Sequence, residues 1–325
     1  SKYLYGGTYT MFNDILPQYG ITVRFVDPLD LDAVEEAISD KTRAVYLETI
    51  GNPALVVPDF EAIAEVAHRR RVPVIADATF TTPYLLRPLE HGVDIVVHSL
   101  TKWIGGHGSA IGGAVVDGGR FDWDDPKFTN LVEPDASYHD VRYAYDLGDL
   151  SPIAYILRMR LVPLRNLGAA ISPDNAWIFL QGLETLPLRM ERHSENAAVV
   201  ADFLSKRDDV EWVWYPGLPG SLGHENARKY LTRGYGGMVT FGIRGGREAG
   251  ERFINALELF SHVANVGDAK SLAIHPASTT HSQLSEAQQR AAHLPPEMIR
   301  LSIGLEHPDD IVADLAHAFD AAAGG

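Results

Sequence analysis

The first half of the chain alternates short apolar runs with segments of helical periodicity. Three runs, Arg43–Glu48, Val72–Asp77 and Asp94–His98, have the composition of buried strands. Between them, Asp59–Arg70 carries apolar residues at helical spacing, and Pro83–His91 predicts a second helix. Strands that alternate with helices form a parallel sheet covered by helices. This pattern restricts the chain to the α/β class.

The chain of 325 residues is longer than one hydrophobic core usually supports, since single cores stop growing at roughly 250–300 residues. Asp174–Leu204 predicts a long helix that would join two lobes. After it, Gly237–Phe241 predicts a strand and Gly246–Leu257 a helix. We therefore expect a large domain over residues 1–186 and a smaller C-terminal α/β domain over residues 187–325.

Composition excludes several classes of function. A net charge of −15 and a pI near 5.2 would repel a nucleic-acid backbone, so we expect no nucleic-acid partner. The one basic run, Arg69–Arg71, ends a predicted helix, where cations complement the helix dipole. No apolar stretch approaches the roughly 20 residues that span a bilayer, so we expect no membrane partner. The absence of cysteine excludes disulfides and thiolate sites, and fits the cytoplasm, where we expect the protein.

Polar clusters follow two of the predicted strands. Asp77 ends one strand, and Ser99–Lys102 come directly after another. In open α/β sheets, ligands bind at this carboxyl edge. Glycines follow the lysine at Gly105–Gly108, whereas a phosphate-binding P-loop needs glycines before a Lys-Ser/Thr pair, and no G-x-G-x-x-G occurs in this stretch. A nucleotide fingerprint is therefore excluded here.

Lys102 is the candidate reactive group in this cluster. A single lysine is most often a solvated surface residue, and a single Asp77 is equally well a turn or capping residue. Burial, however, lowers the pKa of a lysine, and a neutral amine forms an imine with an aldehyde. Ser99 and Thr101 offer hydroxyls to a phosphate, and the Asp77 carboxylate could keep a pyridine nitrogen protonated. Together these residues indicate a site for pyridoxal 5'-phosphate (PLP).

Ordered motifs extend this pattern from one end of the chain to the other. They are Leu4–Thr8, Glu48–Pro53, Asp77–Thr79, Asp94–Lys102, Gly105–Gly108, Gly182–Leu186 with Arg189, His275–Ser278 and Arg300–Gly304. With these motifs the chain resembles the Cys/Met-metabolism family of fold type I PLP-dependent enzymes. The resemblance implies a mainly parallel sheet sandwiched by helices, with a smaller C-terminal α/β domain.

The resemblance also implies roles at the cofactor. Lys102 would hold PLP as a Schiff base and then move protons at the substrate α-carbon. Asp77 would pair with the pyridine nitrogen, and Asn52 would contact the ring hydroxyl oxygen. Ser99 and Thr101 would bind the phosphate.

Four further positions are implied to face the ring or the substrate. Tyr5 would stack on the cofactor ring and act as an acid/base group at the γ-position. Arg300 would bind the substrate α-carboxylate, a role suited to a planar bidentate donor. Asn265 and Val266 would also contact that carboxylate.

Peripheral segments favour one subgroup of the family. Gly7 stands where methionine γ-lyases carry cysteine, and the segments 122–150, 261–268 and 274–281 resemble those of O-acetylhomoserine sulfhydrylases. The implied reaction is γ-replacement: O-acetyl-L-homoserine and sulfide give L-homocysteine and acetate, the direct sulfhydrylation route to methionine. Cystathionine γ-synthase and methionine or cystathionine γ-lyase activities are alternatives, as is a truncated, inactive relative. The acyl donor (acetyl or succinyl) and the thiol (sulfide or methanethiol) stay open.

Some positions depart from the family pattern. Ala78 replaces the usual asparagine after the pyridine-binding aspartate, and Leu100 replaces a small residue. The sequence does not begin with Met, and we expect an upstream segment with a phosphate-binding loop and a Tyr/Arg pair that reaches the phosphate in a neighbouring subunit. The resemblance thus implies a homotetramer, a dimer of dimers with shared active sites.

Histidines of one segment could suggest a metal site. His275 and His281 are six residues apart, but no cysteine and no third ligand at suitable spacing accompany them. We expect no metal, and we expect His107 to belong to the glycine turn.

Overall fold

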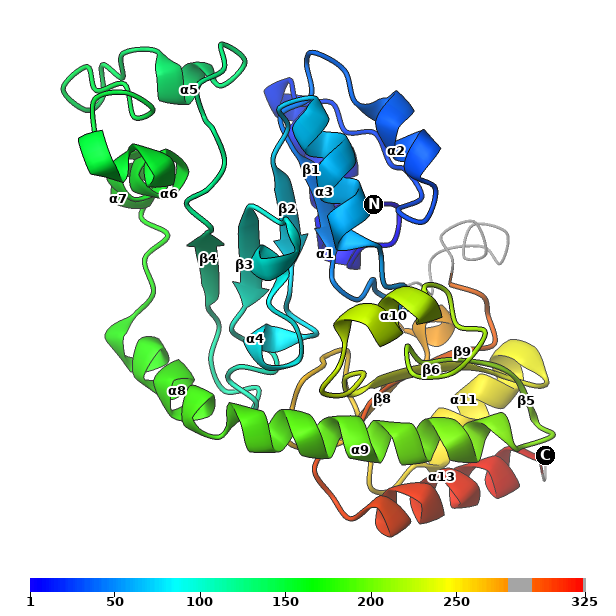
Figure 1. The fold of residues 1–325 in the computed structure, drawn as a ribbon. Coiled ribbons are helices and arrows are strands. Elements are labelled where there is room, and N and C mark those ends of the chain that lie inside the picture. The colour runs from blue at the N-terminus through cyan, green and yellow to red at the C-terminus, as the bar shows by residue number, and fades with distance from the viewer. Residues whose placement is uncertain (280–293, 324–325) are drawn as a thin grey trace.

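The computed structural model describes residues 1–279 and 294–323, and within them the chain forms two β-sheets with helices packed on both (Figure 1). The first sheet has the order β1-β2-β3-β4. Its strands are β1 (Val45–Glu48), β2 (Val74–Asp77), β3 (Ile95–Ser99) and β4 (Gly113–Asp117). The first three are parallel, and β4 is antiparallel to β3. The predicted mainly parallel sheet is confirmed.

Alternating residues of these strands face two different hydrophobic cores. Val74 and Val96 belong to the core that includes helix α3 (Phe60–Arg69), whose N-terminus is capped by the Asp59 side chain. Ile75 and Ile95 face a second core formed with the segment that follows β4. This alternation follows from the period of two along a strand, and it leaves both faces of the sheet covered.

The second sheet has the order β5-β6-β9-β8-β7 and is antiparallel except for the pair β7–β8. Its strands are β5 (Val210–Trp214), β6 (Met238–Ile243), β7 (Ser261–His262), β8 (Leu272–Ile274) and β9 (Met298–Ser302). Helices α9 (Leu186–Ser205), α11 (Gly246–Ala256) and α13 (Pro308–Ala323) share one core with β6 and β9. Figure 1 shows these three helices together on one side of the sheet.

Shorter helices connect these layers. They are α1 (Gly6–Thr10), α2 (Leu31–Ala37), α4 (Thr82–Leu85), α5 (Thr129–Val132), α6 (Ala154–Met159), α7 (Arg165–Leu167), α8 (Pro173–Glu184) and α10 (His224–Tyr230). Additional 3-10 or π-helical turns lie at Met11–Ile15, Leu16–Tyr19, Pro88–His91, Gly148–Ile153, Arg160–Leu164 and Pro276–Ser278.

Two expected helices are interrupted at prolines. The segment Pro83–His91 forms only α4 and a separate 3-10 turn, because Pro88 has no N–H to donate and disfavours helical geometry at the residue before it. The long helix expected over Asp174–Leu204 divides into α8 and α9 at Thr185, with Pro187 in the first turn of α9. The bend between them is visible in Figure 1.

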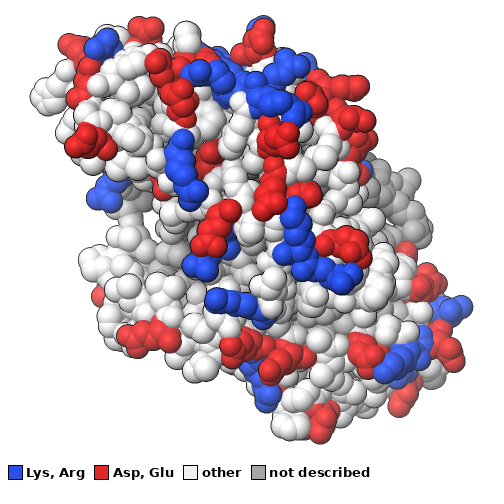
Figure 2. Space-filling model, viewed as in Figure 1, with Lys and Arg blue, Asp and Glu red and all other residues white. Residues whose placement is uncertain are grey.

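The irregular segment after β4 packs against the C-terminal end of α3. Arg71 pairs with Asp122 and Asp125, and the Lys127 ammonium donates to the Arg70 carbonyl. The basic run that begins at Arg69 is therefore compensated by local carboxylates, and Figure 2 shows acidic and basic side chains interspersed over this face. Across the described residues, no helix combines the length and apolarity that a membrane crossing requires.

Candidate functional site

The candidate site lies at the carboxyl edge of the first sheet, where β3 ends at Ser99 and the chain turns through Lys102. The Lys102 N–H donates to the Ser99 carbonyl at 3.3 Å, and the Gly106 N–H donates to the Lys102 carbonyl at 2.7 Å. The buried Arg189 guanidinium holds the following turn, since it donates to the carbonyls of Trp103 at 2.6 Å and Ile104 at 3.0 Å. Arg189 on α9 thus holds in place the turn that carries Lys102.

The Lys102 amine is half-buried between the two sheets. Its Nζ donates to Asn265 Oδ1 at 2.5 Å, from the loop that precedes β8. Burial lowers the pKa of Lys102, and the nearby positive charge of Arg300 lowers it further. A larger share of this amine is therefore neutral near pH 7 than in a solvated lysine, which is what addition to an aldehyde requires.

Asp77 ends β2 beside this turn. Its Oδ1 accepts the Thr79 N–H at 2.8 Å, and Thr79 Oγ1 in turn accepts the Ser99 N–H at 2.8 Å. The Thr101 hydroxyl accepts the Gly112 N–H at 3.1 Å. These contacts join the strand ends that carry the carboxylate and the two hydroxyls. Thr79 had no evident role in the sequence, because its two hydrogen bonds depend on the side-by-side placement of β2 and β3.

Arg300 reaches the site from β9 of the second sheet. Its Nη1 donates to Asn52 Oδ1 at 3.2 Å, which brings together residues 248 positions apart. Burial lowers the pKa of Arg300 to about 10, and Tyr5 opposes this shift. The guanidinium therefore remains charged at neutral pH, and its partial burial strengthens its attraction for a carboxylate.

Tyr5 lies at the start of α1, with 54% of its surface exposed. Its N–H donates to the carboxylate of Glu48 at 2.6 Å, and the same carboxylate accepts the Asn52 N–H at 3.1 Å. Glu48 stands within the motif Glu48–Pro53, but the motif alone implied no role for it. Nothing in the residue order shows that one side chain receives both backbone donors.

The two remaining substrate candidates differ in placement. Asn265 faces Lys102, as described, whereas the Val266 side chain is buried in the core of the first sheet. Only the main chain of Val266 is therefore available to a ligand. The adjacent Gly267 packs so closely on Trp103 that a Cβ there would lie 2.5 Å from the Trp103 nitrogen. This contact packs the loop that carries Asn265 and Val266 against the turn that carries Lys102.

The histidines take structural positions. His107 Nδ1 contacts the Gly105 carbonyl at 2.8 Å within the glycine turn. His275 contacts the Ser278 hydroxyl at 2.8 Å and the Pro296 carbonyl at 2.7 Å. His281 lies outside the described residues. In the part of the chain that the structure describes, no group of three or more His, Asp or Glu side chains is arranged to hold a metal ion.

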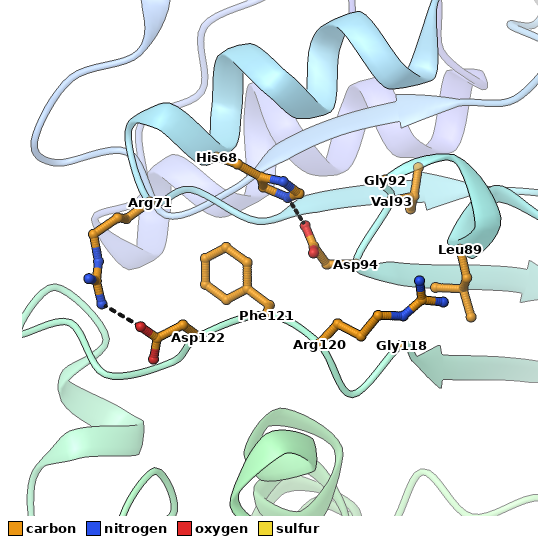
Figure 3. Close-up of a pocket in the computed structure, with 10 residues that line it drawn as sticks. All are labelled: His68, Arg71, Leu89, Gly92, Val93, Asp94, Gly118, Arg120, Phe121 and Asp122. Carbon is orange, nitrogen blue, oxygen red and sulfur yellow. Dashed lines mark hydrogen bonds and ion pairs between the residues drawn. The ribbon is translucent and has the colours of Figure 1, made fainter.

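A surface pocket lies at the opposite edge of the first sheet (Figure 3). It includes Asp94, which precedes β3, and Gly118, which follows β4. In this pocket His68 points to Asp94 and Arg71 to Asp122, and both pairs are within bonding distance. The polar groups are thus largely satisfied by one another, and the pocket is remote from Lys102.

The residues gathered around Lys102 fit PLP by their chemistry. A desolvated amine suits the aldehyde, Asp77 suits the pyridine nitrogen, and the hydroxyls of Ser99 and Thr101 suit the phosphate. A buried guanidinium at the same edge suits an amino-acid carboxylate. An α/β sheet with this donor set at its carboxyl edge defines a PLP-dependent enzyme.

Comparison with known proteins identifies the family. Residues 1–320 match the family described as Cys/Met metabolism PLP-dependent enzyme, and the chain belongs to that family. The sequence is 53% identical to an O-acetyl-L-homoserine sulfhydrylase from Leptospira meyeri, over 98% of this chain and 73% of that protein. It is 48% identical to a homocysteine synthase from Schizosaccharomyces pombe, over 99% of this chain and 75% of the relative.

A solved structure supports the same assignment. A Campylobacter jejuni protein assigned as an O-acetylhomoserine (thiol)-lyase superposes with a TM-score of 0.91 at 40% identity, over 98% of this chain and 76% of that one. That crystal structure contains a pyridoxyl-lysine monophosphate residue. The predicted fold class and the predicted PLP dependence are confirmed.

Proposed function

We propose that the protein catalyses γ-replacement on O-acetyl-L-homoserine: the Cγ–O bond breaks, sulfide forms a Cγ–S bond, and the products are L-homocysteine and acetate. One observation carries this proposal. The desolvated Lys102 amine lies close enough to the partly buried Arg300 guanidinium for the charge of Arg300 to lower its pKa, so one site offers both an imine-forming group and a carboxylate-binding group. The sulfhydrylases among its relatives favour this reaction over others of the family.

The roles of the site residues follow from their placement. Arg300 binds the α-carboxylate of the substrate and so orients its α-carbon toward Lys102. PLP, when bound, supplies the electron sink that makes the α- and β-protons acidic. The Lys102 amine takes and returns the proton at the α-carbon, and Asn265 holds that amine within reach. The Tyr5 hydroxyl provides the acid/base group at the γ-position.

The remaining residues would hold the cofactor. The Asp77 carboxylate would keep the pyridine nitrogen protonated, and the Asn52 amide would contact the ring hydroxyl oxygen. The hydroxyls of Ser99 and Thr101 would bind the phosphate. The main chain at Val266 contributes to the carboxylate site.

We further propose a cytoplasmic homotetramer, built as a dimer of dimers with active sites shared between subunits, and a division into domains at residues 186 and 187. The division is supported by the core of the second sheet, whose buried residues all lie after residue 186, and by the start of α9 at Leu186. The oligomer is supported by exposed apolar side chains on α8, which include Trp177 and Leu180.

The test is a product assay on the PLP-loaded protein. O-acetyl-L-homoserine with sulfide should give equimolar homocysteine and acetate, and Lys102→Ala should remove both the activity and the visible absorption of bound cofactor. Parallel reactions use O-succinyl-L-homoserine, methanethiol and cysteine in place of one reactant. Release of 2-oxobutyrate would instead establish a γ-lyase, cystathionine from cysteine would establish a γ-synthase, and no product with any pair would leave an inactive relative.

A further inference from the structure

We infer that Glu48 is a positioning residue that places Tyr5 and Asn52 together over the cofactor. This inference rests on the proposed function, because it takes those two residues as working members of the site. Glu48 is the last residue of β1, only 7% exposed, and the two oxygens of its carboxylate accept separate backbone N–H groups. One side chain thus ties the N-terminal segment to the turn after β1.

The segment that carries Tyr5 is held at several points, since Tyr9 stacks on Phe25 and Thr8 forms a hydrogen bond with Tyr46. Helix α1, which begins immediately after Tyr5, buries none of its residues. Tyr3 and Leu4 are buried just before it. The 2.6 Å bond from the Tyr5 N–H to Glu48 acts at the residue where the chain leaves the core, and it restrains the direction in which the tyrosine ring projects.

The second bond extends the effect to the substrate pocket. The Asn52 N–H is held by Glu48, and the Asn52 side-chain oxygen is held by Arg300. A shift of the Asn52 main chain would move the amide away from both the cofactor ring and the guanidinium. Glu48 therefore acts on Arg300 through Asn52, without touching the substrate.

The choice of a carboxylate argues for a role beyond packing. Parallel register places Glu48 directly beside Asp77, and burial together with the Asp77 charge raises the pKa of Glu48 to about 8. Ionising a carboxyl group here is unfavourable, and an apolar side chain would fill the space without that penalty. The ionised carboxylate prevails above that pKa, and the bonds from the Tyr5 and Asn52 N–H groups favour it. In that form it offers two acceptor oxygens and no competing donor to two converging N–H groups.

The experiment compares Glu48→Gln with a matched control in the full-length, PLP-loaded protein. The amide retains the length of the side chain but opposes one N–H donor with its own NH₂ group. Asp314→Asn is the control, because Asp314 on α13 is also buried and accepts the backbone N–H groups of residues 258–260, far from the site. Thermal unfolding, the dissociation constant for PLP, and kcat and KM are measured for each at about pH 9, above the pKa of Glu48.

For Glu48→Gln we expect kcat to fall about tenfold, equivalent to about 1.4 kcal/mol in the barrier, together with weaker PLP binding and a changed visible spectrum. Asp314→Asn should lower the unfolding temperature at least as much and leave kcat, KM and the spectrum at wild-type values. A Glu48→Gln variant that differs from wild type only in unfolding temperature would show a purely structural residue.

Two features keep the test decisive. If Glu48→Gln does not fold, Glu48→Asp replaces it in the comparison. The aspartate preserves the charge but is too short to accept both N–H groups, so the same losses in kcat and PLP binding are expected. PLP affinity and the visible spectrum need no turnover, so they test Glu48 even if the wild-type protein makes no homocysteine. Failure of the proposed reaction is then distinct from failure of this inference.

Discussion

At the scale of single residues, desolvation prepares the site before any ligand arrives. Lys102 and Arg300 are two cations near enough for the charge of Arg300 to lower the pKa of Lys102, an arrangement that burial makes more costly. The lysine responds by a lowered pKa, whereas the guanidinium stays charged. The same energetic penalty thus favours a neutral amine at Lys102 and leaves a charged guanidinium at Arg300, the two groups that the proposed reaction needs.

Replacing the arginine should therefore change the titration of the lysine. In Arg300→Met the positive charge that opposes protonation of Lys102 is gone, so the pKa of Lys102 should rise while remaining below its ordinary value, because burial is the larger cause. The rate at which PLP adds to the cofactor-free protein, followed by visible absorbance from pH 6 to about 10, reports the neutral amine.

The midpoint of that pH profile should move upward in Arg300→Met. It should not move in Arg192→Met, which removes a solvated cation on α9. An unchanged midpoint in the first variant would show that Arg300 does not act on Lys102.

At the scale of elements, the strands were predictable from the sequence, and the interruptions of the helices were less so. Apolar runs bounded by turn residues correctly predicted β1, β2 and β3, because burial on both faces leaves few other conformations for such runs. The helix expected over Pro83–His91 breaks before Pro88 because proline has no backbone N–H to donate. The spacing of apolar residues does not reveal this. The role of Glu48 depends on the register between β1 and β2. Arg189 lies on α9, 85 positions after Ile104, whose carbonyl it binds. Neither role could therefore be derived from the neighbouring sequence.

Arg189 should stabilise the lysine turn. Arg189→Met leaves the buried carbonyls of Trp103, Ile104 and Gly182 without their donor, and we expect a loss of about 2–4 kcal/mol in the free energy of unfolding. Urea unfolding measures this loss. Arg192→Met, three residues along the same helix, should change stability by less than about 0.5 kcal/mol. Equal effects of the two substitutions would contradict the anchoring role.

His193 on α9 should make stability fall in acid. Its ring is fully buried against Trp103, and burial lowers its pKa from 6.5 to about 4. The unfolded chain therefore binds this proton first, so stability is lost as pH falls from 6.5 toward 4, by on the order of 3 kcal/mol. Urea unfolding of wild type and His193→Asn over this range isolates the contribution.

The difference in unfolding free energy between the two proteins should shrink as pH falls, because the variant has no imidazole to protonate. Asparagine can still donate to the Ile303 carbonyl that His193 contacts at 2.7 Å. A difference that is constant across the range would mean that His193 does not carry this pH dependence.

At the scale of the whole molecule, the site exists because the two sheets meet. Lys102, Asp77 and Asn52 come from the first sheet, while Arg300 and Asn265 come from β9 and the loop before β8. Family motifs predicted the members of this set from sequence. Their mutual contacts could not be predicted in the same way, because they join positions more than 160 residues apart.

The proposed oligomer makes a prediction about α8. Trp177, Leu180 and Leu183 recur at a spacing of three along this helix and are 63%, 60% and 41% exposed, so they form one apolar face. Such a face is commonly a contact between proteins. We expect the double variant Trp177→Glu and Leu180→Glu to dissociate the tetramer into smaller species, as measured by sedimentation at a fixed protein concentration.

A single exposed leucine offers the control. Leu222 is 43% exposed in a loop of the second lobe, and Leu222→Glu should leave the sedimentation coefficient unchanged because scattered apolar residues are normal on a surface. If sites are shared between subunits, the α8 variant should also lose activity in step with dissociation, and raising its concentration should restore both by mass action. A dissociated variant with full activity would instead show that each chain completes its own site.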